Sequence, residues 1–192
     1  MEILDVLFPA RCTECGRFGE VLCLQCFPHR PPLIRDLDGF SVIALGAYEG
    51  ALRRAVLAMK SGRRDILRAF AVRLASLVAD DAILVGIPTT RSRRHHRGFD
   101  CGVLLASDVA SHSSSRAQRL LDARGIPQHG RSGVARRLAI GRFSIRCTEL
   151  ISSRVTLVDD VCTTGTTMLE CARILMRAQH SVVRALTVAV VP

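Results

Sequence analysis

The chain has 192 residues, of which 48% are hydrophobic, and a formal net charge of +10. This length suits one domain with a small appendage, and the composition is too apolar for a disordered chain. No apolar run approaches the roughly 20 residues that span a membrane. The first ten residues carry Glu2 and Asp5 but no basic residue, the reverse of a secretory signal. We therefore expect a soluble cytoplasmic protein without a membrane span.

The positive charge is confined to the middle of the chain. Residues 51–150 contain 19 basic and 7 acidic groups, whereas residues 1–50 have a net charge of −3 and residues 151–192 a net charge of +1. A basic middle favours anionic partners such as phosphorylated metabolites, nucleic acid or acidic proteins. Only one of the 27 basic residues is a lysine, Lys60, so an arginine-rich coding bias is an alternative explanation of the surplus.

The N-terminal part, residues 1–39, combines a short amphipathic helix expected at residues 1–10, a cysteine cluster and a proline-containing linker expected at residues 28–40. The cluster consists of Cys12, Cys15, Cys23 and Cys26. Two Cys-x-x-Cys turns place four thiolates around one ion, which predicts a structural Zn²⁺ site that orders this segment. An Fe–S cluster is the main alternative, and a redox dithiol is a weaker one.

From residue 40 onward, β-branched apolar runs alternate with helical spacing of Leu, Val and Ala. Strands are expected at residues 41–46, 82–87, 155–158 and 182–191, and helices at residues 51–59, 65–78, 102–110 and 166–178. Residues 111–133 are rich in Ser, Arg and Gly, and we expect loops there around one short element near residues 119–122. This order predicts an α/β domain over residues 40–192, with a parallel sheet flanked by helices.

The stretch 155–167 reads Val-Thr-Leu-Val-Asp-Asp-Val-Cys-Thr-Thr-Gly-Thr-Thr and joins a buried strand to a helix. Free N–H groups and the helix dipole at Thr163–Thr167 suit a phosphate, and Gly165 lets the backbone approach it closely. Asp159 and Asp160 repel phosphate but accept hydrogen bonds from sugar hydroxyls. Together they predict a ribose 5-phosphate site. A plain strand–turn–helix with a threonine cap, or a pair of Mg²⁺ ligands, is the alternative.

All thirteen positions of this stretch resemble the 5-phosphoribosyl-1-diphosphate (PRPP) motif of type I phosphoribosyltransferases, which implies that fold and Mg²⁺ bound together with PRPP. The PRPP-binding residues would be Asp159, Asp160, Val161, Cys162, Thr163, Thr164, Gly165, Thr166 and Thr167. The resemblance also implies a pyrophosphate loop directly after a strand. The candidates for the pyrophosphate side are Lys60, Pro88, Thr89, Arg93, Arg94 and Arg97.

The order of these features is similar to that of the ComF family, phosphoribosyltransferase-like proteins of bacterial competence and DNA uptake. The resemblance rests on five features in this order: the four cysteines, Tyr48-x-Gly50-x-x-Arg53 with Lys60, Ile87-Pro88, Arg97-Gly98-Phe99-Asp100 and the phosphoribosyl loop. Asp100 and Cys101 stand where the family usually has asparagine and glutamine, which puts an acid near the pyrophosphate. The resemblance implies a PRPP-binding protein of natural transformation, with competence proteins among its partners.

Three functions are compatible with these features, and the sequence assigns no catalytic residue. The first is Mg²⁺-dependent transfer of phosphoribose from PRPP to an unknown acceptor. The second is a non-catalytic competence factor that binds single-stranded DNA through the basic middle and keeps the PRPP site as a sensor or relic. Its stacking surface would be small, because only 4% of the residues are aromatic. The third is a regulator that senses PRPP without DNA.

Overall fold

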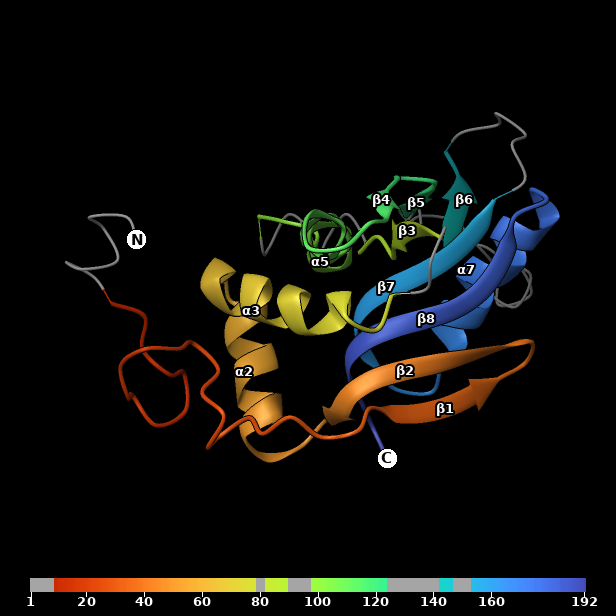
Figure 1. Cartoon of the computed structure of the whole chain (residues 1–192). Coiled ribbons are helices and arrows are strands. Elements are labelled where there is room, and N and C mark those ends of the chain that lie inside the picture. Colours follow the sequence, from red (N-terminus) through yellow and green to blue (C-terminus); the bar gives the residue numbers. More distant parts are fainter. Residues whose placement is uncertain (1–8, 79–81, 90–97, 124–141, 147–152) are drawn as a thin grey trace, which may run out of the picture.

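The computed structural model describes residues 9–78, 82–89, 98–123, 142–146 and 153–192. A six-stranded sheet forms its centre, with the strand order β1-β2-β8-β7-β3-β4 (Figure 1). The edge strand β1 is antiparallel to β2, and all the other neighbours in this sheet are parallel. Strands β5 and β6 form a separate antiparallel pair.

The strands alternate with helices along most of the chain. The strands are β1 (Leu33–Leu37), β2 (Phe40–Ala47), β3 (Ile83–Gly86), β4 (Arg116–Ala117), β5 (Leu121–Ala123), β6 (Phe143–Ile145), β7 (Arg154–Cys162) and β8 (Ser181–Val190). The helices are α2 (Gly50–Lys60), α3 (Arg64–Ala75), α5 (Cys101–Ser111) and α7 (Thr166–Arg177). The expected α/β class with a mostly parallel, helix-flanked sheet is confirmed. Among the residues described, no helix is long and apolar enough to cross a membrane.

Side chains that alternate along the central strands divide the core between the two faces of the sheet. Leu84, Val158 and Leu186 pack with α2, α3 and α5 in one cluster. Their neighbours Val85, Leu157 and Ala185 pack with α7 and the β5–β6 pair in the other. Figure 1 shows α7 on the opposite side of β7 and β8 from α3. Because both faces are covered, the central parts of these strands are mostly apolar, which is why they are recognisable in the sequence.

Helix α5 lies unusually close to the end of β3. A Cβ atom at Gly102 would stand 2.4 Å from the carbonyl oxygen of Ile87, and one at Gly86 would stand 2.5 Å from the carbonyl oxygen of Gly102. Neither position accepts a side chain without a shift of backbone. The paired glycines therefore bring the start of α5 directly against the loop that follows β3.

Two expectations need correction. Residues 33–37 were expected in a linker but form β1, because alternating charge and nearby prolines hid an edge strand that pairs with β2. Strand β7 does not end at Val158 but runs to Cys162, since backbone pairing with β8 continues beyond the apolar run. The helix expected at residues 1–10 falls largely on residues outside those described. The division of the chain after residue 39 stays a prediction.

Candidate functional site

Two loops leave the carboxyl edge of the sheet side by side, one after β3 and one after β7. From β3 the chain passes through α5 to β4 on one side, and from β7 it passes through α7 to β8 on the other. Strands β3 and β7 are neighbours, so the connections diverge between them. Open α/β sheets bind ligands in the crevice at such a switch point. Pro88–Thr89 and the 159–167 stretch both lie at this place.

The two acids at the end of β7 have different surroundings. The carboxylate of Asp160 forms an ion pair with Lys60, with 2.9 Å between Nζ and Oδ1. Asp159 accepts a hydrogen bond from the backbone N–H of Asp160 at 2.8 Å. Burial and the neighbouring Asp160 carboxylate raise the pKa of Asp159 well above its ordinary value, and the ammonium of Lys60 opposes this only in part. The pair therefore holds one carboxylate paired with Lys60 and one whose charged form is disfavoured by its surroundings.

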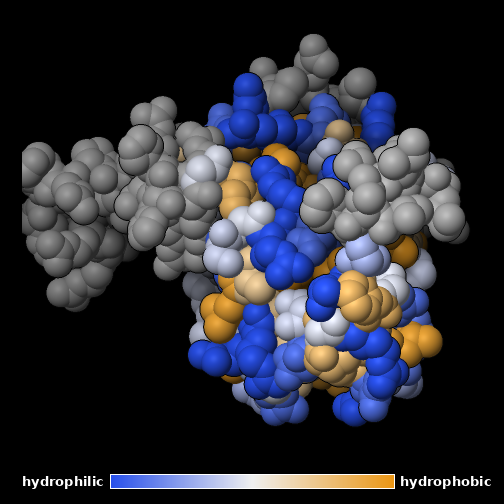
Figure 2. Space-filling view, turned by 90° about the vertical axis from the view of Figure 1, so that its left-hand side faces the viewer, coloured by the Kyte–Doolittle hydropathy of each residue, from blue (hydrophilic) through white to orange (hydrophobic). Residues whose placement is uncertain are grey.

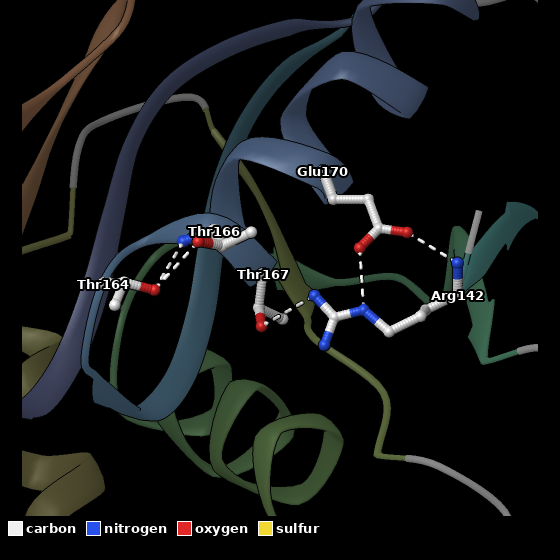
Figure 3. A network of polar contacts seen from close by, with 5 residues as sticks. All are labelled: Arg142, Thr164, Thr166, Thr167 and Glu170. Carbon is white, nitrogen blue, oxygen red and sulfur yellow. Dashed lines mark hydrogen bonds and ion pairs between the residues drawn. The ribbon is translucent and has the colours of Figure 1, made fainter. Parts of the chain in front are cut away.

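The turn after β7 presents polar groups to the solvent at the start of α7. Thr163, Thr164 and Thr166 are exposed, and the hydroxyls of Thr164 and Thr166 lie 2.9 Å apart. Gly165 has φ +79° and precedes a helix with no acidic residue in its first turn, where the N–H of Thr166 donates only a long hydrogen bond of 3.4 Å to Thr164 Oγ1 (Figure 3). Such a helix start leaves N–H groups that suit an anion.

The turn is braced from the edge strand β1. A Cβ at Gly165 would come within 2.7 Å of Leu37 Cδ2. The guanidinium of Arg35 donates to the carbonyl oxygens of Thr163 at 2.5 Å and Val191 at 2.7 Å. Strand β1, missed in the sequence, thus supports the loop that the sequence singled out.

Val161 and Cys162, which belong to the predicted set of ligand-binding residues, direct their side chains into the core. Cys162 is buried in the cluster beneath α7, and Val161 packs against the opposite cluster. Burial also raises the pKa of the Cys162 thiol. The side chain of Cys162 is therefore not available to a ligand, whereas that of Val161 is half-buried.

Arg142 is a member of the site that sequence reasoning did not find. Its backbone N–H and its Nε donate to the carboxylate of Glu170 at 2.6 and 2.9 Å, and its Nη2 donates to Thr167 Oγ1 at 3.3 Å (Figure 3). The guanidinium thereby stands beside the start of α7, where the carboxylate of Glu170 balances its charge. No local pattern connects residue 142 with residues 167 and 170, so only the fold shows their proximity.

Of the residues predicted for the pyrophosphate side, those next to β3 are described by the structure and the three arginines that follow are not. Pro88 is buried and Thr89 is half-buried, and the N–H of Thr89 donates to both carboxylate oxygens of Asp100 at 3.1 Å each. Phe99 lies under the guanidinium of Arg64, 4.7 Å from its ring centre. Arg93, Arg94 and Arg97 lie outside the described residues.

The four N-terminal cysteines come together as their spacing predicts. The sulfur atoms of Cys12, Cys15, Cys23 and Cys26 lie within 4.8 Å of one another, and those of Cys15 and Cys23 are 3.7 Å apart. Zn–S bonds of about 2.3 Å in a tetrahedron place the sulfurs about 3.8 Å apart. The thiolates of an Fe–S cluster surround several metal atoms and are spread more widely. The cluster therefore suits a single tetrahedral ion.

The electrostatics of the cysteines agree with a metal centre. Burial raises the pKa of the Cys12 thiol, but backbone hydrogen bonds from Cys15, Cys23 and Glu14 outweigh it and lower the pKa to about 6. In the absence of a metal, burial and the neighbouring thiols raise the pKa of Cys26 to about 12. A divalent cation would offset this second effect, since it favours the thiolate form.

The cysteine segment is attached to the rest of the fold by arginines. The guanidinium of Arg73 on α3 donates to the carbonyl oxygens of Leu22 and Phe27, at 2.8 Å each. Arg54 on α2 forms an ion pair with Glu14. A cleft of about 510 Å³ lies between residues 26–33 and the turn from β2 to α2, and no residue of the 159–167 stretch lines it.

No family model and no curated protein matches the chain. Solved structures with a similar backbone include the allosteric regulatory enzyme of purine biosynthesis, with 17% identity and a TM-score of 0.48. A glutamine PRPP amidotransferase from B. subtilis has 18% identity and the same TM-score of 0.48. Each of these matches covers 63% of this chain and 25% of the other, so the chain spans about a quarter of their length.

A third similar structure is the adenine phosphoribosyl transferase of Trypanosoma brucei, in complex with AMP, pyrophosphate and ribose-5-phosphate. It has 13% identity and a TM-score of 0.42, and the match covers 82% of this chain and 74% of the other. At such identities and TM-scores, the similarity is limited to part of the path of the backbone. The chemistry of this site is therefore argued from its own residues.

Proposed function

We propose that this chain binds a phosphorylated ribose of the PRPP type at the carboxyl end of β7. In this arrangement the 5-phosphate lies on the turn Thr163–Thr167, and the ribose hydroxyls bind Asp159 and Asp160. The pyrophosphate side is formed by Lys60, by Pro88–Thr89 and by the arginines at positions 93, 94 and 97.

The observation that carries this proposal is that groups suited to an anion and groups suited to hydroxyls lie together at the end of β7. The start of α7 favours an anion, because the N-cap residue Gly165 has no side chain and the first turn holds no acidic residue, while Arg142 remains within reach of Thr167. Two carboxylates, one already satisfied by Lys60, favour hydroxyl groups a few residues away. A free phosphate needs only the first set, and a plain sugar needs only the second. A sugar phosphate uses both.

Two metal ions belong to the proposal in different roles. Zn²⁺ would be held by the four cysteines and would stabilise the N-terminal segment. Mg²⁺ would arrive with PRPP, bound by its pyrophosphate and ribose hydroxyls, because the cysteines are the only group of three or more potential ligand side chains among the described residues. The protein residues at the switch point would then position the ligand rather than coordinate the ion.

The wider role that we propose is that of a ComF-like, phosphoribosyltransferase-family protein in DNA uptake. Support comes from the order of the motifs along the chain and from the proximity of the residues predicted at the β7 site. Mg²⁺-dependent transfer of phosphoribose is one form of this function. It requires pyrophosphate release that depends on an acceptor, and binding of PRPP without release by any base or amine would exclude it.

The binding site is tested by calorimetric titration with PRPP and Mg²⁺. The wild-type chain is compared with Asp159→Asn/Asp160→Asn and with the exposed control Asp38→Asn. We expect the double variant to lose at least about tenfold in affinity, because two charged hydrogen-bond acceptors are replaced. Equal binding by the double variant and the wild type would show that the site is elsewhere.

A non-catalytic single-stranded-DNA-binding function is the second candidate. It is favoured by exposed arginines on α2 and α3, namely Arg53, Arg64 and Arg68. On the face in Figure 2, hydrophilic residues form a band down the middle, and hydrophobic residues gather only in small groups. Contacts made mainly to phosphates predict affinity that falls steeply with salt and depends little on sequence. Fluorescence anisotropy with oligonucleotides at several salt concentrations tests this, and salt-insensitive binding would exclude it.

A further inference from the structure

Asp100 turns both carboxylate oxygens toward the end of β3 instead of toward its own helix. The residue directly precedes α5, yet it makes no side-chain capping bond to that helix. Its Oδ1 and Oδ2 each lie 3.1 Å from the backbone nitrogen of Thr89. A negative charge therefore already sits on a backbone donor of the loop after β3.

The position of this carboxylate is determined by backbone packing. The contact between Gly86 and Gly102 holds the first turn of α5 against the end of β3, where any side chain would overlap. The N–H of Ile87 is bound to the carbonyl oxygen of Val158 at 2.9 Å, which ties the same loop to β7. Asp100 thus meets Thr89 because the surrounding backbone leaves little freedom.

The carboxylate lies in the part of the crevice that a second phosphate group would need. The turn 163–167 packs against Leu37 of β1, on the side of β7 away from β3. In the arrangement proposed above, a ribose that extends from this turn past Asp159 would direct its C1 substituent toward β3, the strand next to β7. Burial and Asp160 raise the pKa of Asp159, and the charge of Asp100 adds to this effect, so Asp100 acts on the same crevice.

We propose that Asp100 is a specificity-determining residue that occupies the backbone donor of Thr89 and disfavours a diphosphate at C1. The site would then select a ribosyl monophosphate, such as ribose 5-phosphate or a nucleoside monophosphate, over PRPP. This inference rests on the proposed function and names the ligand class of the same site.

The test is calorimetric titration of the full chain with inorganic pyrophosphate, PRPP and ribose 5-phosphate, each with and without added Mg²⁺. Asp100→Asn keeps an oxygen acceptor for the N–H of Thr89 but removes the charge. Asp100→Ala removes both and leaves the donor to the ligand. Asp108→Asn makes the same charge change on α5 about 12 Å further along and is the matched control. Thermal midpoints of all variants report folding.

We expect Asp100→Asn to bind pyrophosphate and PRPP roughly tenfold more tightly, as removal of one opposing charge a few ångströms away should produce. Binding of ribose 5-phosphate should change by less than about twofold, because its phosphate lies on the other side of β7. Asp108→Asn should resemble the wild type. Unchanged or weaker binding of pyrophosphate and PRPP by Asp100→Asn would overturn the inference. If Asp100→Asn bound pyrophosphate and PRPP more weakly only when Mg²⁺ is present, the inference would also be overturned. Asp100 would then be a ligand of the Mg²⁺ ion that accompanies the diphosphate.

Failure of this inference and failure of the proposed function give different results. If wild-type protein binds ribose 5-phosphate but Asp100→Asn gains nothing with pyrophosphate, the function stands and the role of Asp100 is wrong. If the wild type does not bind ribose 5-phosphate while Asp100→Asn gains pyrophosphate affinity, the anion site beside Thr89 stands and the ribose site is wrong. If the wild type does not bind ribose 5-phosphate and Asp100→Asn gains no pyrophosphate affinity, both the proposed function and the role of Asp100 are wrong.

Discussion

Asp159 is the residue at which binding and stability conflict most directly. Its side chain is half-buried at the end of β7, beside a second acid, and desolvation and that acid both raise its pKa above the ordinary value. The folded protein therefore binds this proton more tightly than the unfolded chain does. Stability falls as the pH rises through the window between the unfolded and the folded pKa, and the full cost remains above it.

We therefore predict that Asp159→Asn stabilises the ligand-free protein at neutral pH. A gain of about 1 kcal/mol corresponds to a rise of roughly 2–4 °C in the thermal midpoint of a chain of this size. The amide still accepts the hydrogen bond from the N–H of Asp160. The gain should shrink below the ordinary pKa of an aspartate, where the wild-type carboxyl is neutral. Thermal scans at several pH values check this, and Asp38→Asn, in an exposed turn, should show no such dependence. A lower midpoint at neutral pH would contradict the prediction.

Arg142 should contribute to recognition of the phosphate rather than of the sugar. We predict that Arg142→Gln weakens binding of ribose 5-phosphate by about tenfold, the loss of one charged hydrogen bond, without changing the weak binding of unphosphorylated ribose. Glu170→Gln should give a smaller loss, since it only loosens the guanidinium. Arg146→Gln, an exposed arginine on the same short segment, is the control. Equal losses with both sugars would instead indicate a structural role.

At the scale of elements, the helix start of α7 and the edge strand β1 depend on each other. Gly165 meets two requirements, since its φ of +79° disfavours any side chain and its Cα faces Leu37. An element missed in the sequence thus determines why the most recognisable motif needs a glycine at this position. The sequence predicted the loop but not its support.

We predict that Gly165→Ala costs more than the backbone effect alone. Gly98→Ala isolates that effect, because Gly98 has nearly the same φ of +77° but no atom within 4 Å of a new Cβ. It should cost about 1–2 kcal/mol. Gly165→Ala should exceed it, and Leu37→Ala in the Gly165→Ala background should recover part of the excess. Urea denaturation measures all three. Equal costs for the two glycine changes would mean that Leu37 moves aside freely.

At the scale of the whole molecule, the four-cysteine centre is part of the main core. Cys12, Leu22 and Phe27 belong to the same buried cluster as Val56 and Phe70 of α2 and α3. Helix α2 also ends at Lys60, which reaches Asp160. The cysteine segment and the candidate ligand site therefore both contact α2, through Arg54 and Lys60, so loss of the metal should be felt beyond the N-terminal segment.

We predict one zinc ion per chain and a fall of more than about 10 °C in the thermal midpoint when a chelator removes it. A structural zinc site contributes several kcal/mol to folding, and each kcal/mol corresponds to roughly 2–4 °C here. Elemental analysis and thermal scans check both statements. Added zinc should restore the midpoint, which separates metal loss from damage by the chelator. An unchanged midpoint after complete removal would show that the segment folds without metal.

The sequence by itself determined the features that depend on neighbours in the chain. The α/β class, the 155–167 stretch and the four cysteines all follow from local spacing, because apolar runs, turn residues and paired thiols act over a few positions. The bounds of β7 and the existence of β1 were not predictable in this way. Both depend on backbone pairing with other strands, which overrides local charge and proline content.

Only the tertiary structure decided which distant residues meet at the switch point. It brings Lys60 to Asp160, Arg142 to Thr167 and Asp100 to Thr89. These contacts depend on how helices pack on the sheet, and two paired glycines have as much influence there as any charge. The sequence thus determined that a sugar phosphate is the expected ligand. The fold decided which charged side chains already have partners at the candidate site, because helix packing on the sheet sets those distances.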